Sequence, residues 1–192
     1  MTRLIIMGPP GSGKGTQAEH IAHHFAIPAI STGDLFRAHV RDKTTLGAEA
    51  GKYMDHGEFV PDGITTAMVS QRLEEPDAGA GFLLDGFPRT VAQVDALEDL
   101  LSAKQQPLDA VLALSVDDDE LVARMLRRAQ EQGRSDDTES VIQRRLELYR
   151  DETAAVVSAY SKRGILLIVD GSGDREQITA KAIAAVESAL TG

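Results

Sequence analysis

The sequence contains no cysteine among its 192 residues. This absence excludes disulfide bonds, thiol nucleophiles and zinc sites built on thiolates, and it fits a reducing compartment. No apolar stretch approaches the roughly 18 residues that a membrane-spanning helix needs. The N-terminus is not typical of a secretory signal, because its short apolar run leads directly into a glycine-rich segment. We therefore expect a protein of the cytoplasm with no membrane partner.

Positive charge is also scarce. The 30 Asp and Glu residues outnumber the 20 Lys and Arg residues, which gives a formal net charge of −10 and a pI of about 4.9. A chain this acidic is poorly suited to nucleic acid as a bulk partner. Its length is typical of one compact domain with a sizeable core, and no long exposed apolar stripe is evident. We therefore expect a monomer.

Short apolar runs alternate with longer segments of helical periodicity along the chain. The runs are bounded by Gly, Pro, Asp or Ser, and their alternation with helices indicates an α/β fold whose parallel sheet has helices on both faces. The predicted strands, about five in number, lie at residues 3–7, 29–31, 82–85, 110–116 and 165–170. The predicted helices lie at residues 14–25, 34–42, 46–56, 63–73, 91–103, 120–129, 139–162 and 175–189.

Two insertions interrupt this alternation and predict small flaps on a single domain spanning residues 1–192. Residues 31–60 are expected to form a helical flap, and the polar residues 129–138 a short lid loop. The predicted core comprises residues 1–30, 61–128 and 139–192. Loops and flaps of this kind often close over a substrate.

A glycine-rich segment, Gly8-Pro-Pro-Gly-Ser-Gly-Lys-Gly-Thr16, follows the first predicted strand and opens the first predicted helix. Its glycines let backbone N–H groups approach phosphate oxygens, the helix N-terminus adds partial positive charge, and Lys14 adds a full charge. In the generic pattern a hydroxyl residue follows the lysine directly, whereas here Gly15 intervenes. The alternative is a glycine turn that only caps a helix. The predicted phosphate ligands are Gly11, Ser12, Gly13, Lys14, Gly15 and Thr16.

Arginine is distributed unevenly, with six arginines between positions 124 and 145. In an acidic chain this concentration indicates a site for a small polyanion. The competing interpretation is a solvated helix face, on which the arginines pair with Asp and Glu one turn away. We expect Arg127 and Arg144 to be surface residues.

Four motifs, in this order, resemble those of the adenylate kinases, and the resemblance runs nearly the full length of the chain. They are Gly-Lys-Gly-Thr16, Ser31-Thr-Gly-Asp34 with Arg37, Asp85-Gly-Phe-Pro-Arg89-Thr-x-x-Gln93, and Gly133-Arg134-Ser-Asp-Asp137 with Arg145. Four motifs together are far more specific than any one. The resemblance implies a three-layer phosphate-loop fold with a helical monophosphate-binding flap and a short lid. It also implies reversible phosphoryl transfer from MgATP to AMP, which gives two ADP.

The resemblance assigns an AMP end of the site to residues on and beside the flap. Arg37 and Arg89 would bind the AMP phosphate, since a guanidinium suits two phosphate oxygens at once. Gln93 would read adenine, because its amide offers a donor and an acceptor side by side. Asp85 would hold Mg²⁺ through water. Further AMP contacts are implied for Thr32, Glu58 (through its backbone), Phe59, Val60, Gly86, Phe87, Pro88, Arg134 and Arg145.

At the ATP end, the resemblance implies an electrostatic clamp around the transferred phosphoryl group. Arg124 and Arg128 would reach the ATP phosphates, and the backbone of Gly173 would border the ATP adenine. Mg²⁺ is the expected cofactor, whereas the structural zinc of long-lid relatives is not expected in a chain without cysteine. No general base is needed, because the AMP phosphate is already an anionic nucleophile. The implied catalytic residues are Lys14, Arg89, Arg124, Arg128, Arg134 and Arg145.

Other activities remain as alternatives. UMP and CMP kinases share the fold, but they tend to have asparagine after Gly-Phe-Pro-Arg, where this chain has Thr90. A shikimate-type small-molecule kinase would share the loop and the short lid, but it would need neither Gln93 nor a flap with Arg37. A GTPase-type switch reads guanine through an Asn-Lys-x-Asp segment, and the sequence contains no asparagine.

Overall fold

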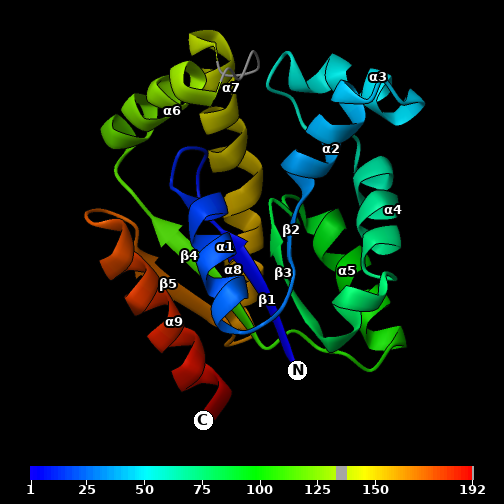
Figure 1. Cartoon of the computed structure of the whole chain (residues 1–192), viewed down its shortest axis with the longest axis vertical. Helices are drawn as coiled ribbons and strands as arrows, with labels where there is room; N and C mark the ends of the chain where they lie inside the picture. Colours follow the sequence, from blue (N-terminus) through cyan, green and yellow to red (C-terminus); the bar gives the residue numbers. More distant parts are fainter. Residues whose placement is uncertain (133–137, 192) are drawn as a thin grey trace.

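The computed structural model of the protein describes residues 1–132 and 138–191 and is built on one parallel sheet (Figure 1). The strand order is β2-β3-β1-β4-β5. This arrangement confirms the predicted α/β fold with a central parallel sheet. The strands are β1 (Thr2–Met7), β2 (Ala29–Ser31), β3 (Gly81–Asp85), β4 (Ala110–Ser115) and β5 (Leu166–Asp170).

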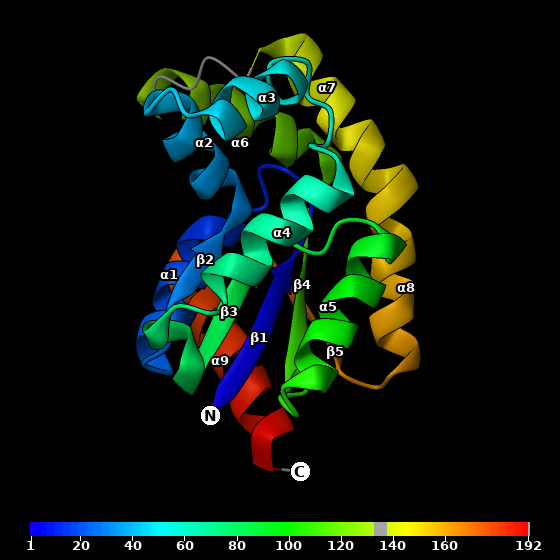
Figure 2. The ribbon, with the colours of Figure 1, turned by 90° about the vertical axis from the view of Figure 1, so that its right-hand side faces the viewer.

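Strand β1 lies in the middle of the sheet, between β3 and β4, and its two faces enter separate parts of the core. Ile5 and Met7 pack in a cluster with residues of α5 (Val91–Ala103) and α8 (Ala154–Lys162). Leu4 and Ile6 pack in another cluster with residues of α1 (Lys14–His24) and α9 (Arg175–Thr191). Because side chains alternate along a strand, one apolar run serves both faces. Figure 2 shows the resulting three layers.

All five strands run in the same direction, so their carboxyl ends lie along a single edge of the sheet. The register pairs Ile6 of β1 with Asp85 of β3, and Ser31 of β2 with the same Asp85. The loop after β1 and the segments after β2 and β3 therefore begin side by side. Ligands of open parallel sheets bind at this edge.

The flap consists of α2 (Thr32–Arg41) and α3 (Thr45–Met54), and it is followed by α4 (Asp62–Arg72) and a 3₁₀ helix (Pro76–Ala80). It has its own small apolar cluster, in which Phe36 and Ala50 pack with Val60 and Met68. The two flap helices approach so closely that a Cβ on Gly47 would lie 2.1 Å from the carbonyl oxygen of His39. This tight hairpin requires glycine at position 47.

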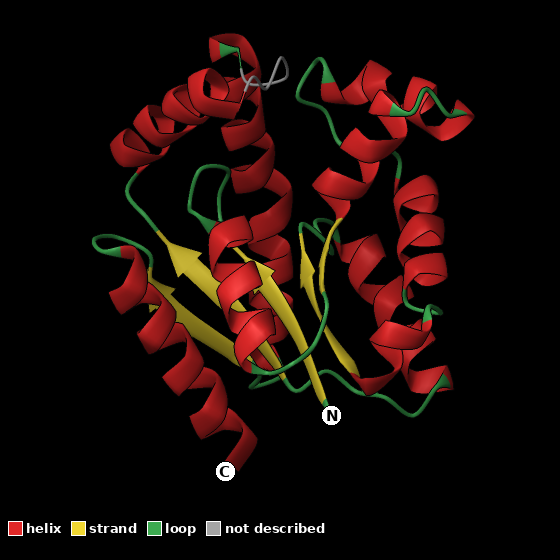
Figure 3. Ribbon diagram, viewed as in Figure 1, coloured by secondary structure: helices red, strands yellow, loops and turns green. Residues whose placement is uncertain are grey.

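The helices on the other side of the edge differ in part from the predicted ones. Helix α6 (Asp118–Gln132) continues beyond the predicted end at residue 129, so the first residues of the expected lid loop are helical. The helix predicted at residues 139–162 is divided into α7 (Glu139–Leu148), a π-helical turn (Tyr149–Thr153) and α8. Figure 3 shows the helices packed around the strands of the sheet. Periodicity alone cannot detect a single π turn, because apolar spacing changes little across it. Along residues 1–132 and 138–191, none of the helices is both long and apolar enough to span a membrane.

Candidate active site

A cleft of about 830 Å³ opens above the carboxyl edge of the sheet. Its walls come from the loop after β1, the flap, the segment after β3, and helices α6 and α7. In Figure 1 the loop after β1 lies beneath the space between α6 and the flap helices. The cleft brings together every predicted site residue that the structure describes: Gly11, Ser12, Gly13, Lys14, Gly15, Thr16, Thr32, Arg37, Glu58, Phe59, Val60, Asp85, Gly86, Phe87, Pro88, Arg89, Gln93, Arg124, Arg128, Arg145 and Gly173.

The glycine-rich loop has the backbone that an anion cradle needs. Gly11 has a φ of +83° and Gly13 a φ of +87°, a region that residues with a Cβ rarely adopt. A Cβ on Gly11 would lie 2.8 Å from the carbonyl oxygen of Leu121 in α6, so glycine is also required for packing there. A Cβ on Gly13 would meet nothing within 4 Å. Gly13 is the N-cap of α1, so the open space lies at a helix N-terminus, where anions are stabilised.

Lys14 is held inside the loop, with its Nζ donating to the carbonyl oxygen of Pro9 at 3.0 Å. Burial lowers the pKa of Lys14 from 10.5 to about 8. The carboxylate of Asp85 opposes this shift, whereas the positive charges of Arg89, Arg128 and Arg145 add to it. A lysine whose charge is disfavoured in this way gains the most when an anion binds beside it.

Asp85 ends strand β3 and faces the phosphate loop. Its Oδ1 is buried and has no hydrogen-bond partner among the described residues. Burial raises the pKa of Asp85, and the opposing effects of Lys14 and Arg89 are smaller. An orphaned carboxylate oxygen in a cleft fits a divalent cation or a water bound to one, since hard cations take oxygen ligands.

Arg89 lies partly buried on the flap side of the cleft. Its Nε donates to the carbonyl oxygen of Gly86 at 2.9 Å, and its guanidinium lies 5.3 Å from the ring centre of Phe59. Burial lowers the pKa of Arg89, with Asp85 acting in the opposite direction. Thr32 also donates to the Gly86 carbonyl, at 3.0 Å. Gly86 has a φ of +80°, and a Cβ there would lie 2.7 Å from the Thr32 hydroxyl, so this junction also depends on glycine.

Gln93 is 2% exposed, and both ends of its amide are bonded. Its Oε1 accepts from the backbone N–H of Arg89 at 2.8 Å, and its Nε2 donates to Asp62 at 2.7 Å. The other oxygen of Asp62 accepts from the hydroxyl of Thr90 at 2.9 Å. Sequence reasoning did not identify Asp62, because an acidic residue in the first turn of a helix is common and its partners are 28 and 31 positions away.

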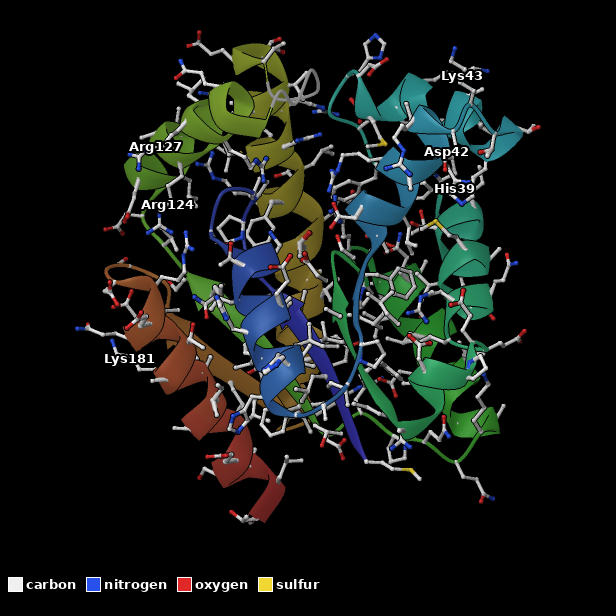
Figure 4. The ribbon with its side chains drawn as sticks, in the orientation of Figure 1. His39, Asp42, Lys43, Arg124, Arg127 and Lys181 are labelled. Atoms are coloured by element: carbon white, nitrogen blue, oxygen red, sulfur yellow. The ribbon has the colours of Figure 1, made fainter. Side chains whose placement is uncertain are left out.

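The clustered arginines have different surroundings. Figure 4 shows Arg124 beneath α6, and its guanidinium donates to the carbonyl oxygen of Gly171 at 3.2 and 3.3 Å and to that of Ser12 at 3.5 Å. Arg124 thus touches the phosphate loop itself. Arg128 and Arg145 line the cleft and act on the charge of Lys14. Arg37 pairs with Asp34 of the same helix. Arg134 lies outside the described residues.

The two arginines expected to be ordinary surface residues differ from each other. Arg127 is exposed at the rim of the cleft (Figure 4). Arg144 is half-exposed, and its Nε forms an ion pair with Glu58 at 2.8 Å, across the junction of the flap and α7. A Cβ on Gly57 would lie 3.0 Å from the carbonyl oxygen of Val141 in α7, so the chains also meet there. Arg144 is thus at the surface, as expected, and it also pairs with Glu147 one turn away, but its ion pair with Glu58 spans 86 positions and was not predicted.

The fold and the cleft define a phosphate-loop α/β protein in which one cavity has an anion cradle at one end and a partly buried arginine at the other. Comparison with known proteins narrows this class. The adenylate kinase family model matches residues 6–165. The chain is 56% identical to an adenylate kinase of Pseudarthrobacter chlorophenolicus, with 98% of both chains covered, and 57% identical to one of Renibacterium salmoninarum, with 97% of both covered. This chain belongs to the adenylate kinase family, whose members are phosphotransferases.

Proposed function

We propose that this protein transfers the terminal phosphoryl group of ATP to AMP, reversibly, and so produces two ADP. The observation that carries the proposal is that one cleft contains both the phosphate loop with Lys14 and the partly buried Arg89. Asp85 lies close enough to both cations to act on the pKa of each, and the charge of Arg89 also lowers the pKa of Lys14. The phosphates of two nucleotides bound at the two ends would therefore meet near Asp85, and direct transfer needs such a meeting.

The chemistry requires positioning and charge neutralisation rather than a base. An oxygen of the AMP phosphate attacks the γ-phosphorus of ATP, and the bond from that phosphorus to the β–γ bridging oxygen breaks. The bonding electrons leave with the first ADP, and the new P–O bond completes the second. Charge spreads over the equatorial oxygens during transfer, and Lys14, Arg128 and Arg145 are assigned to stabilise it. Arg134 remains a proposed fourth member of this group.

Arg124 has a different role within the same proposal. Its contacts with the Ser12 and Gly171 carbonyls favour holding the phosphate loop against the segment after β5. We therefore infer that it also shapes the loop that binds the ATP phosphates. The positive φ of Gly173, +97°, and its position in the wall of the cleft support a backbone contact with the ATP adenine.

Mg²⁺ is the proposed cofactor, and the buried oxygen of Asp85 supports that proposal. When bound with ATP, Mg²⁺ neutralises charge on the β- and γ-phosphates. Asp85 would hold it through water, and the intervening Gly15 leaves Thr16 as the hydroxyl of the loop. The raised pKa of Asp85 favours a cation there, because a nearby positive charge stabilises the carboxylate.

The acceptor end is proposed to bind AMP. Arg89 and Arg37 would bind its phosphate, with Phe59 packed against Arg89, and Gln93 would hydrogen-bond adenine. We infer that the flap at residues 31–60 and the lid at residues 129–138 close around the nucleotides and expel water, which would limit hydrolysis of ATP. We also propose that the protein acts as a monomer in the cytoplasm. Size-exclusion chromatography with light scattering tests the monomer directly.

Phosphoryl transfer from MgATP to AMP, GMP, CMP and UMP tests the proposed function, with nucleoside diphosphate as the measured product. We expect a strong preference for AMP and two ADP formed for each AMP consumed. Preference for CMP or UMP would contradict the adenine assignment while leaving the phosphate sites intact. Transfer to none of the four would contradict the proposal as a whole.

A further inference from the structure

We propose that Asp62 is a specificity-determining positioning residue: it fixes the amide of Gln93 in the orientation that accepts adenine and rejects 6-oxopurines. Asp62 is the first residue of α4, directly after the flap. Its two carboxylate oxygens accept from Gln93 Nε2 at 2.7 Å and from Thr90 Oγ1 at 2.9 Å. The inference deepens the proposed function and rests on it, since it assumes that Gln93 faces the acceptor base.

The partners of Gln93 leave its amide only one satisfactory orientation. An ionised carboxylate can only accept a hydrogen bond, so the amide nitrogen must face Asp62. A backbone N–H can only donate, so the amide oxygen must face Arg89 N, which it does at 2.8 Å. Rotating the amide by 180° would set oxygen against carboxylate and N–H against N–H. Both bonds would be lost in a buried site, where unpaired polar groups are costly.

The fixed amide keeps free capacity on both atoms. An amide nitrogen has two hydrogens and an amide oxygen has two lone pairs, so each atom can form one more bond. Adenine presents N1 as an acceptor and its 6-amino group as a donor. A 6-oxopurine presents the reverse, with N1–H as the donor and O6 as the acceptor, and would require the rotated amide. Asp62 therefore discriminates between bases without touching them.

The network around Asp62 joins elements that are distant in sequence. Thr90 is the N-cap of α5, where its hydroxyl also accepts from the backbone N–H of Gln93 at 3.2 Å. The Thr90 hydroxyl therefore donates to Asp62 and accepts from Gln93 in one continuous chain. A carboxylate held by two donors cannot readily turn away from Gln93, and buried networks of this kind lose more than one bond when a member is removed.

The test compares kcat/KM for AMP and for IMP, whose base is the simplest 6-oxopurine, in the wild type, Asp62→Asn and Asp62→Ala. Asparagine can present either an oxygen or an N–H to Gln93, so it removes one of the two constraints on the amide while it preserves volume; the backbone N–H of Arg89 still favours the original orientation. We expect the AMP-to-IMP ratio to fall by about tenfold in Asp62→Asn. Asp95→Asn is the matched control, because it removes the same charge at an exposed position of α5 outside the cleft, and its ratio should not change.

A merely structural role for Asp62 would lower both kcat/KM values together, and an unchanged ratio in both Asp62 variants would overturn the inference. If Asp62→Ala does not fold, Asp62→Asn alone decides. The same substitution in a Gln93→Ala background should leave the ratio unchanged, because Asp62 would act through Gln93. A ratio that still falls there would also overturn the inference. A wild type that does not prefer AMP would instead contradict the proposed function, so the two failures are distinguishable.

Discussion

The two ends of the cleft are built in different ways. The phosphate loop is one continuous segment, residues 8–16, whose anion cradle consists of backbone N–H groups, a helix N-terminus and Lys14. The acceptor end is assembled from side chains of separate elements, and each side chain has a bonding partner: Asp62 for Gln93, the backbone carbonyl of Gly86 for Arg89, and Asp34 of the same helix for Arg37. At this end of the cleft, bonded residues can be far apart in the sequence, and Gln93 and Asp62 are separated by 31 positions.

This difference predicts which substitutions each end of the cleft tolerates and which it does not. A backbone cradle tolerates changes in most neighbouring side chains, but it depends on its glycines and on one full charge. A side-chain network depends on every member, because removal of one partner leaves another buried and unpaired. Substitutions at the two ends should therefore affect the two nucleotides separately.

The largest effect is expected at the ATP end, for Lys14→Met. The substitution preserves the length of the side chain but removes the charge at the transferred phosphate, so kcat should fall by about 10³-fold. Steady-state rates with saturating MgATP and AMP measure it, with circular dichroism to verify the fold. Lys104→Met, on the exposed end of α5, is the control and should retain the wild-type rate. A rate for Lys14→Met within tenfold of the wild type would remove Lys14 from catalysis.

Arg89→Ala is the corresponding test of the acceptor end. It removes a charge-assisted contact with the AMP phosphate at a partly buried site, so kcat/KM for AMP should fall by about 100-fold, while the KM for ATP stays within about threefold. Arg89→Lys should restore little of the lost kcat/KM, because an ammonium group cannot form the bidentate contact that a guanidinium makes with two phosphate oxygens. Arg41→Ala, an exposed flap arginine, serves as the control. Equal losses for both nucleotides would contradict the separation of the two ends.

Gly47→Ala tests the flap without touching a binding residue. Its Cβ would lie 2.1 Å from the His39 carbonyl oxygen, so the α2–α3 hairpin must shift. Overpacking of this kind costs about 1–3 kcal/mol. Thermal unfolding should show a lower Tm, and AMP use should suffer more than ATP binding. Gly63→Ala, where a Cβ would meet nothing within 4 Å, is the control and should leave the Tm nearly unchanged.

The pKa of Lys14 predicts that ATP binding is coupled to proton uptake at the ATP end of the cleft. In the free protein burial lowers this pKa to about 8, and a bound triphosphate should raise it again. At about pH 9 most free protein therefore has neutral Lys14, so ATP binding should take up close to one proton. At about pH 6.5 Lys14 is already charged, and uptake at this position should vanish. Calorimetry in buffers of different ionisation enthalpy measures it, and uptake that persists in Lys14→Met would contradict the assignment.

The same pKa has a consequence for stability. Between about pH 8 and pH 10.5 the unfolded chain holds the Lys14 proton more strongly than the folded chain. The contribution of Lys14 to the free energy of unfolding should therefore rise with pH through this window. This rise should be absent in Lys14→Met, because methionine does not titrate.

The smallest effect is expected for the ion pair between Glu58 and Arg144, which joins the flap to α7. Both side chains are about 40% exposed, and exposed ion pairs contribute little because solvent screens them. Glu58→Gln should change the KM for AMP by less than about threefold. Arg144→Met should match it, since either substitution breaks the same pair. A loss comparable to that of Arg89→Ala would mean that the pair controls flap position.

The two ends also differ in how far sequence predicts them. The phosphate loop could be predicted almost entirely, because its strand, glycines, lysine and helix are consecutive residues. Arg89 and Gln93 could be predicted only through resemblance to a family, since nothing in their local sequence identifies a partner. Asp62 and the pairing of Arg144 with Glu58 were missed because tertiary folding alone brings these residues together. The strands were predicted within a residue or two, whereas the π turn at Tyr149–Thr153 was not.

One binding experiment tests the separation of the two ends most directly. AMP and a non-hydrolysable ATP analogue are each titrated into the wild type, Lys14→Met and Arg89→Ala by calorimetry. We predict that Lys14→Met weakens binding of the ATP analogue and leaves AMP binding near the wild-type value, and that Arg89→Ala does the reverse. Loss of both nucleotides in either variant would contradict the account, because the cleft would then act as one undivided site.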